Sequence, residues 1–435
     1  MRGLHLLLAI GNATMMAIPL PASAQASQPS PLKSPNMLLI TADDMNGDSP
    51  GCFGNPLPDV TPNIDRLAAE GLRFTHAHVT SAVCTPCRSV LLTGLYPHRS
   101  GVEGFQRVRP GVPTLPALLR QAGYLCGTLG KWLGQQETFQ WTDFYTDADL
   151  GGENIFGRNP DVYYRFTHAF FDKARRTGLP VFLMANAADP HRPFHRSLRH
   201  RQRFEGPGRH VPDPSRIFRA EEVPVPGFLP DLPDVRTELA QFYSSVRRCD
   251  DTVGAVLKAL DESGAAGDTL VVFLSDNGMP FPFAKTNCYY NSTRTPWIVR
   301  WPGRVKPGSI DRDHMISTLD FMPTVLDAAG IPLPPVTDGR SLLPLLRGES
   351  QTGRDLVFTQ FHHIHGVRPY PMRAVQDRRF GYIFNPWADG TRAYHAEPLS
   401  DLTFAAMQKA ADSDPAVRRR THFLQYRCVE EFYDY

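Results

Sequence analysis

The chain has 435 residues, of which 42% are hydrophobic and 21% are charged, an ordinary composition for a folded globular protein. Its formal net charge of +2 excludes the strong overall field with which proteins attract nucleic acid or an anionic membrane, so an anionic ligand would have to be held by local charges. The length allows one large α/β domain with a smaller appendage.

The first 24 residues have the pattern of a signal peptide. Arg2 supplies a positive charge, apolar stretches follow, and Ala22-Ser23-Ala24 fits the small-x-small cleavage pattern. A short membrane anchor is the alternative interpretation. Residues 25–35 are rich in Ser, Pro and Gln and indicate a flexible leader. We therefore expect an exported protein, periplasmic or secreted (lysosomal in a eukaryote), with no membrane span after signal cleavage.

An apolar run over residues 36–42 (NMLLITA) predicts a parallel strand that is buried on both faces. Asp43 and Asp44 follow this strand directly. Open α/β sheets bind their ligands at the carboxyl ends of the strands. The two carboxylates therefore stand where a ligand site is expected.

Helical and strand-like segments alternate along the next part of the chain. Helices are predicted at 61–71, 84–94, 113–122 and 235–263, strands at 180–186 and 269–275, and a long irregular surface excursion at 192–235. This alternation predicts an α/β fold with a large, mostly parallel sheet sandwiched by helices. The main domain would span residues 36–350.

The pattern changes after about residue 350. Short apolar runs such as 356–361 and 380–384 predict a smaller C-terminal α+β domain, over residues 351–435, built on a short antiparallel sheet.

The seven cysteines are scattered along the chain and odd in number: Cys52, Cys84, Cys87, Cys126, Cys249, Cys288 and Cys428. This spacing excludes a disulfide framework, although an exported protein can still form one or two bridges. At least one cysteine must have another role.

Cys84 lies at the predicted start of a helix, where the helix dipole stabilises negative charge and lowers the pKa of a thiol. Arg88 is four residues further on, so it shares a helix face with Cys84 and can contact an anion there. These residues indicate a reactive, anion-binding cysteine. A buried structural cysteine and a redox pair of Cys84 with Cys87 are the alternatives.

A second polar pair, Asp276-Asn277, follows the strand predicted at 269–275. Together with Asp43 and Asp44 it makes an all-oxygen set of three carboxylates and an amide, which hard divalent cations such as Ca²⁺ or Mg²⁺ prefer. Two solvated turns would have similar sequences and are the alternative.

The segment from Cys84 to Gly94 contains C-x-P-x-R followed by L-L-T-G, and so resembles the signature of the formylglycine-dependent sulfatases, members of the alkaline-phosphatase-like superfamily. In that family the cysteine is oxidised after translation to formylglycine, an aldehyde that serves as the nucleophile. The resemblance implies that modified Cys84 binds one metal, usually calcium, together with the two polar pairs, and that a formylglycine-generating enzyme matures the protein.

Three further residues match positions that have known roles in the sulfatase family. Lys131 and Lys285 stand where sulfatases have sulfate-binding basic residues, and His191, in DPHRP, matches the histidine that contacts the sulfate and protonates the leaving group. Leu133 stands where the family has a histidine, and the chain stops at EEFYDY, before the final segment of most relatives. The resemblance therefore implies catalytic roles for Cys84, Arg88, Lys131, His191 and Lys285.

The likeness is greatest to the heparan N-sulfatase (sulfamidase) branch, through SDNGMPFP, DPHRP and YPMRAVQ. It implies a sulfated sugar substrate, such as a glucosamine of glycosaminoglycans, cleaved at an N-sulfate or a sulfate ester. A phosphonate or phosphodiester hydrolase of the same superfamily, and a degenerate sulfatase that only binds sulfated glycans, are the alternatives.

Overall fold

The computed structural model describes residues 34–131, 135–145, 155, 157–206, 211–364 and 369–435. The expected signal peptide, most of the expected leader and Leu133 lie outside these residues. Within the described part, no helix combines the length and the apolar character that crossing a membrane requires.

An eight-stranded sheet forms the centre of the fold, in the order β5-β4-β6-β1-β7-β8-β2-β9. Its strands are β1 (Asn36–Asp43), β2 (Leu72–Phe74), β4 (Leu125–Gly130), β5 (Asp143–Tyr145), β6 (Val181–Pro190), β7 (Thr269–Ser275), β8 (Trp297–Arg300) and β9 (Ser309–Asp311). Every neighbouring pair is parallel except the two that include β8. The predicted mostly parallel sheet is confirmed.

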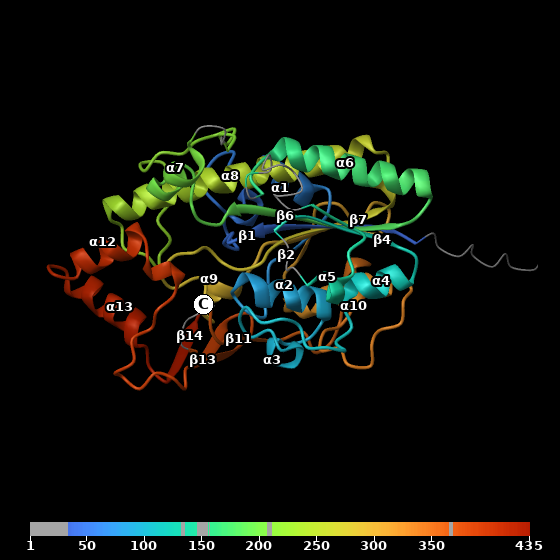
Figure 1. Ribbon diagram of the computed structural model, residues 1–435. Helices are drawn as coiled ribbons and strands as arrows, with labels where there is room; N and C mark the ends of the chain where they lie inside the picture. The colour runs from blue at the N-terminus through green and yellow to red at the C-terminus, as the bar shows by residue number, and fades with distance from the viewer. Residues whose placement is uncertain (1–33, 132–134, 146–154, 156, 207–210, 365–368) are drawn as a thin grey trace, which may run out of the picture. The chain divides into compact units, whose positions relative to one another are not determined.

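Helices cover both faces of this sheet (Figure 1). One layer contains α1 (Pro62–Ala69), α6 (Pro160–Thr177) and α8 (Pro233–Glu262), and the other contains α2 (Cys84–Thr93), α4 (Leu115–Gln121) and α10 (Phe321–Ala328). Strand β1 alternates between the two layers, because Leu38 and Ile40 pack with the first group and Met37 and Leu39 with the second. The sheet is therefore buried on both faces, as its apolar strands predicted.

The largest differences from the predicted elements lie in two segments. Strand β6 continues past residue 186 to Pro190, where it still pairs with the end of β1 beyond a register shift. The segment expected to be irregular, 192–235, contains the helix α7 (Leu198–Phe204), whose N-terminus is capped by the side chain of Ser197.

The shorter elements connect these layers. They are β3 (Ala77–His78), β10 (Ile316–Ser317), α3 (Pro97–Ser100), α5 (Gln136–Phe139), α9 (Tyr290–Thr293) and α11 (Leu343–Leu346).

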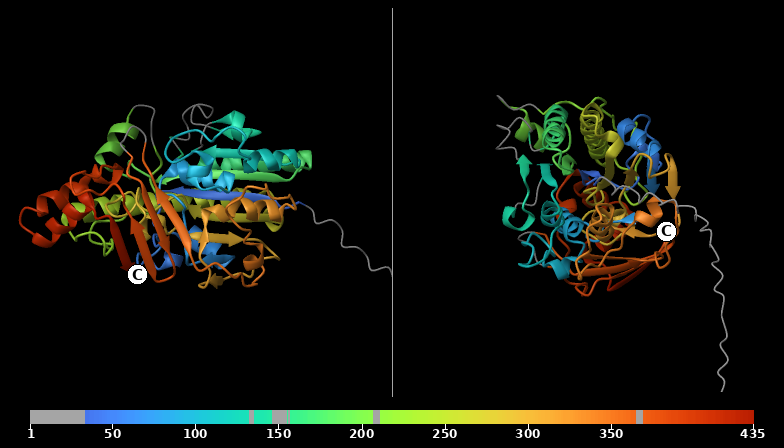
Figure 2. Two further views of the ribbon diagram at one scale, coloured as in Figure 1. Left: turned by 90° about the horizontal axis from the view of Figure 1, so that it is seen from below. Right: turned by 90° about the vertical axis from the view of Figure 1, so that its right-hand side faces the viewer.

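A second, antiparallel sheet lies in the C-terminal part, with its four strands side by side in Figure 2. It consists of β11 (Val357–Phe361), β12 (Met372–Gln376), β13 (Phe380–Phe384) and β14 (Glu430–Asp434), and the helices α12 (Leu402–Ala410) and α13 (Pro415–Tyr426) accompany it. The prediction of a small C-terminal antiparallel sheet is confirmed.

This small sheet shares a hydrophobic core with the main part of the chain. Ile383 of β13 and Phe404 of α12 pack in one cluster with Val83, which precedes α2, and with Phe283. Residues 34–435 form one compact unit by their contacts. The division into domains at residue 350 stays a prediction, and the shared core means that the C-terminal part supports segments near the carboxyl edge of the main sheet.

Candidate active site

Four parallel strands bring the predicted site residues to one edge of the sheet. Strands β4, β6, β1 and β7 are consecutive neighbours and all run in the same direction, so their carboxyl ends meet. Lys131 follows β4, His191 follows β6, Asp44 follows β1 and Asp276 follows β7. The parallel topology therefore gathers residues that are distant in sequence, such as Asp44 and Asp276, which are 232 positions apart.

Cys84 is the first residue of α2 and is only 6% exposed. Burial raises the pKa of its thiol, while the charges of Lys131 and Lys285 favour the thiolate and those of Asp43 and Asp276 oppose it. Cys84 thus lies within electrostatic reach of both predicted metal-binding pairs, as the sequence predicted. As an ordinary thiol in this place it would be protonated and a weak nucleophile.

All seven cysteines are free thiols. The bridges that an exported protein can form are therefore absent from this chain. The proposed redox pair also loses support, because burial raises the pKa of Cys87 well above its usual range.

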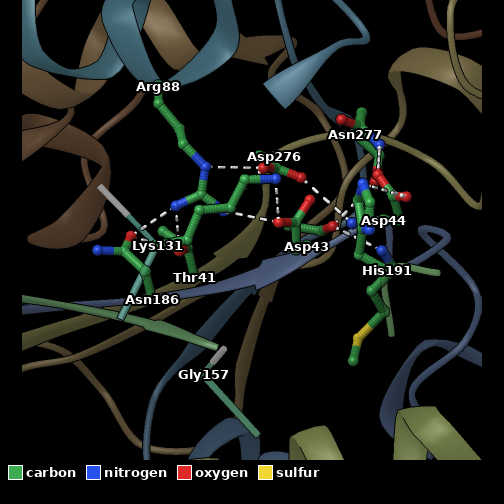
Figure 3. Close-up of polar contacts among 12 residues, drawn as sticks. Thr41, Asp43, Asp44, Arg88, Lys131, Gly157, Asn186, His191, Asp276 and Asn277 are labelled. Carbon is green, nitrogen blue, oxygen red and sulfur yellow. Dashed lines mark hydrogen bonds and ion pairs between the residues drawn. The ribbon is translucent and has the colours of Figure 1, made fainter. Parts of the chain in front are cut away.

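Arg88 contacts residues at the carboxyl ends of β1, β6 and β7 (Figure 3). Its Nε and Nη2 lie 2.8 and 2.7 Å from Oδ2 of Asp276, and its Nη1 donates to Oγ1 of Thr41 at 3.0 Å and to Oδ1 of Asn186 at 2.6 Å. The guanidinium is 1% exposed, and its Nη2 lies 3.8 Å from Asp43. The planar fork of donors therefore fixes β1, β6 and β7 relative to the start of α2.

Asp44 is held in a left-handed backbone conformation, with φ at 71°, which Asp and Asn adopt more readily than most residues. Its Oδ2 accepts from Nζ of Lys285 at 2.9 Å, and its Oδ1 accepts from Nδ2 of Asn277 at 2.6 Å. Its backbone N–H donates to Oδ1 of Asp276 at 3.2 Å. The two predicted polar pairs are therefore in direct contact.

The buried carboxylates of the site repel one another. Burial and the charge of Asp43 raise the pKa of Asp44 to about 6 against the effect of Lys285, and they raise that of Asp276 to about 6 against the effect of Arg88. Asp43 itself is buried, but the charges of Lys131, His191 and Arg88 hold its pKa well below the usual range. A cation placed among the three carboxylates would relieve this repulsion.

The donor atoms fit a hard divalent cation. Oδ1 of Asp43 and Oδ1 of Asn277, one at each strand end, are buried oxygens without a hydrogen-bond partner among the described residues. Such atoms are costly in a folded protein unless a ligand satisfies them. Ligand atoms of Asp43, Asp44 and His191 also lie within 4.8 Å of one another. The structure thus adds His191 to the vicinity of the predicted set of Asp43, Asp44, Cys84, Asp276 and Asn277.

The two predicted lysines pair with different carboxylates of the site. Lys131 ion-pairs with Asp43, with 31% of its side chain exposed, whereas Lys285 is buried against Asp44. The adjacent carboxylates raise the pKa of both lysines even though burial opposes it. Both lysines are therefore charged in the site, as a role in holding an anion requires.

His191 faces the same cluster with its Nε2, which lies 3.9 Å from Oδ2 of Asp44. Its Nδ1 is 2.7 Å from the carbonyl oxygen of Arg192, so Nδ1 carries the proton in the neutral ring and Nε2 is free to accept one. Burial and the charge of Lys285 lower the pKa of His191 to about 4. An anion bound beside the ring would raise this pKa.

A second buried ionic cluster consists of Asp189, Arg158 and Arg248, and we call it the support cluster. It contacts the backbone of the segment that carries His191. The guanidinium of Arg248 binds both oxygens of Asp189 at 2.7 and 3.0 Å, and Nε of Arg158 lies 3.3 Å from Oδ1. Arg158 also donates to the carbonyl oxygen of His191 at 2.9 Å. Asp189 therefore positions Arg158, which in turn holds the backbone at His191.

Sequence patterns missed three residues of the site: Thr41, Asn186 and Glu397. Thr41 and Asn186 bind Arg88, and Oγ1 of Thr41 donates to Oδ1 of Asn186 at 2.8 Å. Asn186 ends a predicted strand, so its polar side chain at a carboxyl end was an available signal. Glu397 contacts Lys285 and His191 but lies far along the chain, where no local pattern marks it.

Comparison with known proteins places these features in a family. The sulfatase family profile matches residues 35–331, and the profile described as N-sulphoglucosamine sulphohydrolase, C-terminal, matches residues 281–387. The chain belongs to the sulfatase family and is a sulfuric ester or sulfamate hydrolase by that membership.

Individual relatives agree with the family profile. The chain is 35% identical to the N-sulphoglucosamine sulphohydrolase of Homo sapiens over 80% of this chain and 73% of that protein, and 31% identical to the steryl-sulfatase of Mus musculus over 80% and 70%. A solved structure of a protein in complex with its substrate D-glucosamine-2-N,6-O-disulfate shares the fold, with a TM-score of 0.66 at 20% identity over 90% of this chain and 97% of that one.

The phosphonate monoester hydrolase of Agrobacterium radiobacter also shares the fold, with a TM-score of 0.61 at 20% identity over 89% of this chain and 96% of that one.

Proposed function

We propose that this chain hydrolyses an N-sulfate or a sulfate ester of a sulfated sugar, such as a glucosamine of glycosaminoglycans, through formylglycine formed at position 84. The convergence of Cys84 with two acidic strand ends and three basic side chains carries this proposal. The 35% identity to a human N-sulphoglucosamine sulphohydrolase supports the sugar substrate.

A divalent metal, calcium or alternatively magnesium, fits the oxygen donors of Asp43, Asp44, Asp276 and Asn277 together with modified Cys84. The buried, unpartnered oxygens of Asp43 and Asn277 support this assignment. When bound, the metal would supply positive charge beside the sulfuryl oxygens and favour ionisation of a hydroxyl at position 84.

In the first step, one hydroxyl oxygen of hydrated formylglycine attacks sulfur, and the bond from sulfur to the sugar oxygen or nitrogen breaks. Arg88, Lys131 and Lys285 neutralise the charge on the sulfuryl oxygens. His191, whose Nε2 faces the cluster, gives a proton to the departing alcohol or amine. The anionic substrate would raise the pKa of the buried imidazole and so favour its protonated form.

In the second step, the other hydroxyl at position 84 loses its proton and its oxygen forms the aldehyde. The bond from carbon to the sulfated oxygen breaks at the same time, and sulfate leaves. A thiol or a serine hydroxyl at this position lacks the second hydroxyl and would remain sulfated. This difference explains why the weakly nucleophilic buried thiol needs oxidation before it can turn over substrate.

Maturation and location follow from the same proposal. A formylglycine-generating enzyme would oxidise Cys84, and export would bring the protein to the periplasm, the extracellular space or, in a eukaryote, the lysosome. Determination of the N-terminus of the protein purified from its host would test export, because cleavage is expected near Gln25.

The direct test is mass spectrometry of the peptide that contains Cys84, on protein produced with the modifying enzyme, together with a screen of defined glucosamine sulfates. We expect formylglycine in the active fraction and release of sulfate from one position of the sugar. An unmodified thiol in fully active protein would refute the mechanism.

The same screen addresses the two alternatives. Faster hydrolysis of a phosphodiester than of any sulfate would favour the alternative of a phosphonate or phosphodiester hydrolase, and a phosphonate monoester hydrolase shares this fold. Binding of a sulfated glycan without sulfate release, with formylglycine present, would indicate a binding protein.

A further inference from the structure

Glu397 reaches the site from the C-terminal part of the chain. It begins a short 3-10 helix, Glu397–Leu399, just before α12. This position lies beyond the residues that either family profile matches, which end at residue 387. The carboxylate is therefore a feature of this chain that the family match does not account for.

The carboxylate of Glu397 contacts two predicted catalytic residues. Its Oε2 lies 2.7 Å from Nζ of Lys285, and its Oε1 lies 3.8 Å from Nε2 of His191. The side chain of Glu397 is 28% exposed, whereas that of Lys285 is 2% exposed. Glu397 is therefore the more solvent-accessible partner of this ion pair.

Glu397 is negatively charged in this setting. Burial favours its neutral form, but the charges of Lys285, His191 and Arg192 outweigh burial and lower its pKa to about 2. Its two oxygens face one ammonium group and one imidazole, and both of these groups can also bind a sulfuryl oxygen. An anion held by Lys285 and His191 would therefore lie close to this carboxylate.

The charge of the site depends on this one residue. Across the described residues, four carboxylates and three cations form the connected ion pairs of the site: Asp43, Asp44, Asp276 and Glu397 with Arg88, Lys131 and Lys285. These seven groups carry one negative charge in total, and replacement of Glu397 by a neutral residue would remove that charge from the site.

Resting on the proposed function, we propose that Glu397 is a specificity-determining residue that favours tetrahedral groups with one negative charge, such as sulfate monoesters and sulfamates, over dianions such as phosphate monoesters. The carboxylate repels the second charge of a dianion more than it hinders a monoanion, because Coulomb energy scales with the product of the charges.

The test compares two sulfur-centred tetrahedral ions of similar size, the sulfamate monoanion and the sulfate dianion. Their dissociation constants are measured by calorimetry at neutral pH and fixed ionic strength on the full-length, metal-loaded protein. We expect Glu397→Gln to shift the ratio of the two constants toward sulfate by about tenfold. Glu397→Asp keeps the charge and is expected to keep the ratio closer to that of the unaltered protein.

Glu349→Gln is the matched control, because Glu349 is exposed and lies outside the site. It removes the same formal charge and should leave the ratio unchanged, so a general field effect is separated from the local one. A purely structural role for Glu397 in placing Lys285 would weaken both ions equally. An equal loss, an unchanged ratio in Glu397→Gln, or no binding of either ion would overturn the proposal.

Turnover of 4-nitrophenyl sulfate and 4-nitrophenyl phosphate separates this proposal from the proposed function. Glu397→Gln should raise the relative kcat/KM for the phosphate, again by about tenfold. If the unaltered protein hydrolyses neither sulfates nor sulfamates, the proposed function fails, and the binding ratio of the two ions still decides the role of Glu397.

Discussion

The two buried ionic clusters of this protein differ in how completely their charges are satisfied. In the support cluster, two guanidinium groups hold the single carboxylate of Asp189 and, against burial, lower its pKa. In the active site, the pKa values of Asp44 and Asp276 are raised, and buried oxygens of Asp43 and Asn277 have no hydrogen-bond partner within the part of the chain that the structure describes. The support cluster matches its single carboxylate with two guanidinium groups, whereas the site holds three crowded carboxylates whose repulsion a bound cation would relieve.

This difference separates the roles of the two clusters. A satisfied buried ion pair holds geometry, and removal of one partner leaves an uncompensated charge. A crowded group of carboxylates lowers stability by itself and gains free energy when a cation binds. The comparison therefore predicts that substitutions in the support cluster affect folding and that substitutions in the site affect ligand binding and turnover.

The largest effect is expected at Cys84. Cys84→Ala removes the precursor of the nucleophile and should reduce sulfate release by at least about a thousandfold. Because the substitution removes only the sulfur atom of one buried side chain, the fold should be retained, which circular dichroism and urea unfolding would check. Activity comparable to that of the unaltered protein would show that position 84 is not the nucleophile.

The next largest effect is on stability. Asp189→Asn leaves Arg248 and Arg158 without their carboxylate and should lower the free energy of unfolding by about 3–5 kcal/mol. Asp44→Asn, in metal-free protein, should change it by less than about 1 kcal/mol, because Asn tolerates the left-handed backbone at this residue and Lys285 keeps its pair with Glu397.

Urea unfolding of both variants at one pH, after treatment with a chelator, measures this contrast. Equal losses of stability in Asp189→Asn and Asp44→Asn would contradict the division of roles between the two clusters.

Metal binding sharpens the same comparison. Addition of calcium to the metal-free protein should raise the free energy of unfolding, by about 2.7 kcal/mol at a free concentration one hundred times the dissociation constant. Asp44→Asn should lose most of this stabilisation, since Asp44 is one of the proposed ligands. Thermal unfolding with increasing calcium measures the effect, and magnesium in the same assay compares the two ions.

The smallest expected effect concerns the buried imidazole of His78, which is neutral in the folded protein. Burial, with the charges of Arg294 and His76, lowers the pKa of His78 from 6.5 to about 3. The unfolded ring binds a proton below pH 6.5 and the folded ring does not, so stability is lost as the pH falls from 6.5 toward 3. The slope from this residue is at most about 1.4 kcal/mol per pH unit.

His78→Asn removes this titration and should make stability less dependent on pH between about pH 5 and about pH 6.5. Urea unfolding across this range measures the change in slope. An unchanged slope would mean that His78 is protonated in the folded protein as well.

Much of the fold could be predicted because buried parallel strands have continuous apolar sequences. The strand at 269–275 and the helix that begins at Cys84 have the expected bounds. Strand β2 has only three residues, and its place in the sheet depends on pairing with β8 and β9, which are distant in sequence. The continuation of β6 to Pro190 was missed because Asp189 is buried through its partner Arg248, and not through an apolar side chain.

Those site residues that stand in a recognisable local sequence pattern could be predicted. Polar pairs at strand ends and a cysteine at a helix start are visible in the sequence, and the structure brings Asp43, Asp44, Asp276 and Cys84 together. Their roles as metal ligands and nucleophile stay predictions. Glu397 could not be found, because its approach to Lys285 depends on how the C-terminal part packs against the main part of the chain.

Helix α8 contacts the segment that carries His191 and the helices α12 and α1. Its Glu238 accepts from Arg192, beside His191, and from the backbone N–H of Thr403 in α12, while its Asp250 accepts from the first turn of α1. The helix has 30 residues and is therefore about 45 Å long. Because its turns cannot shift independently, a change of volume on its buried face would be transmitted along its axis. Substitutions of α8 residues that never touch substrate are thus expected to alter the position of His191, the proposed proton donor to the leaving group.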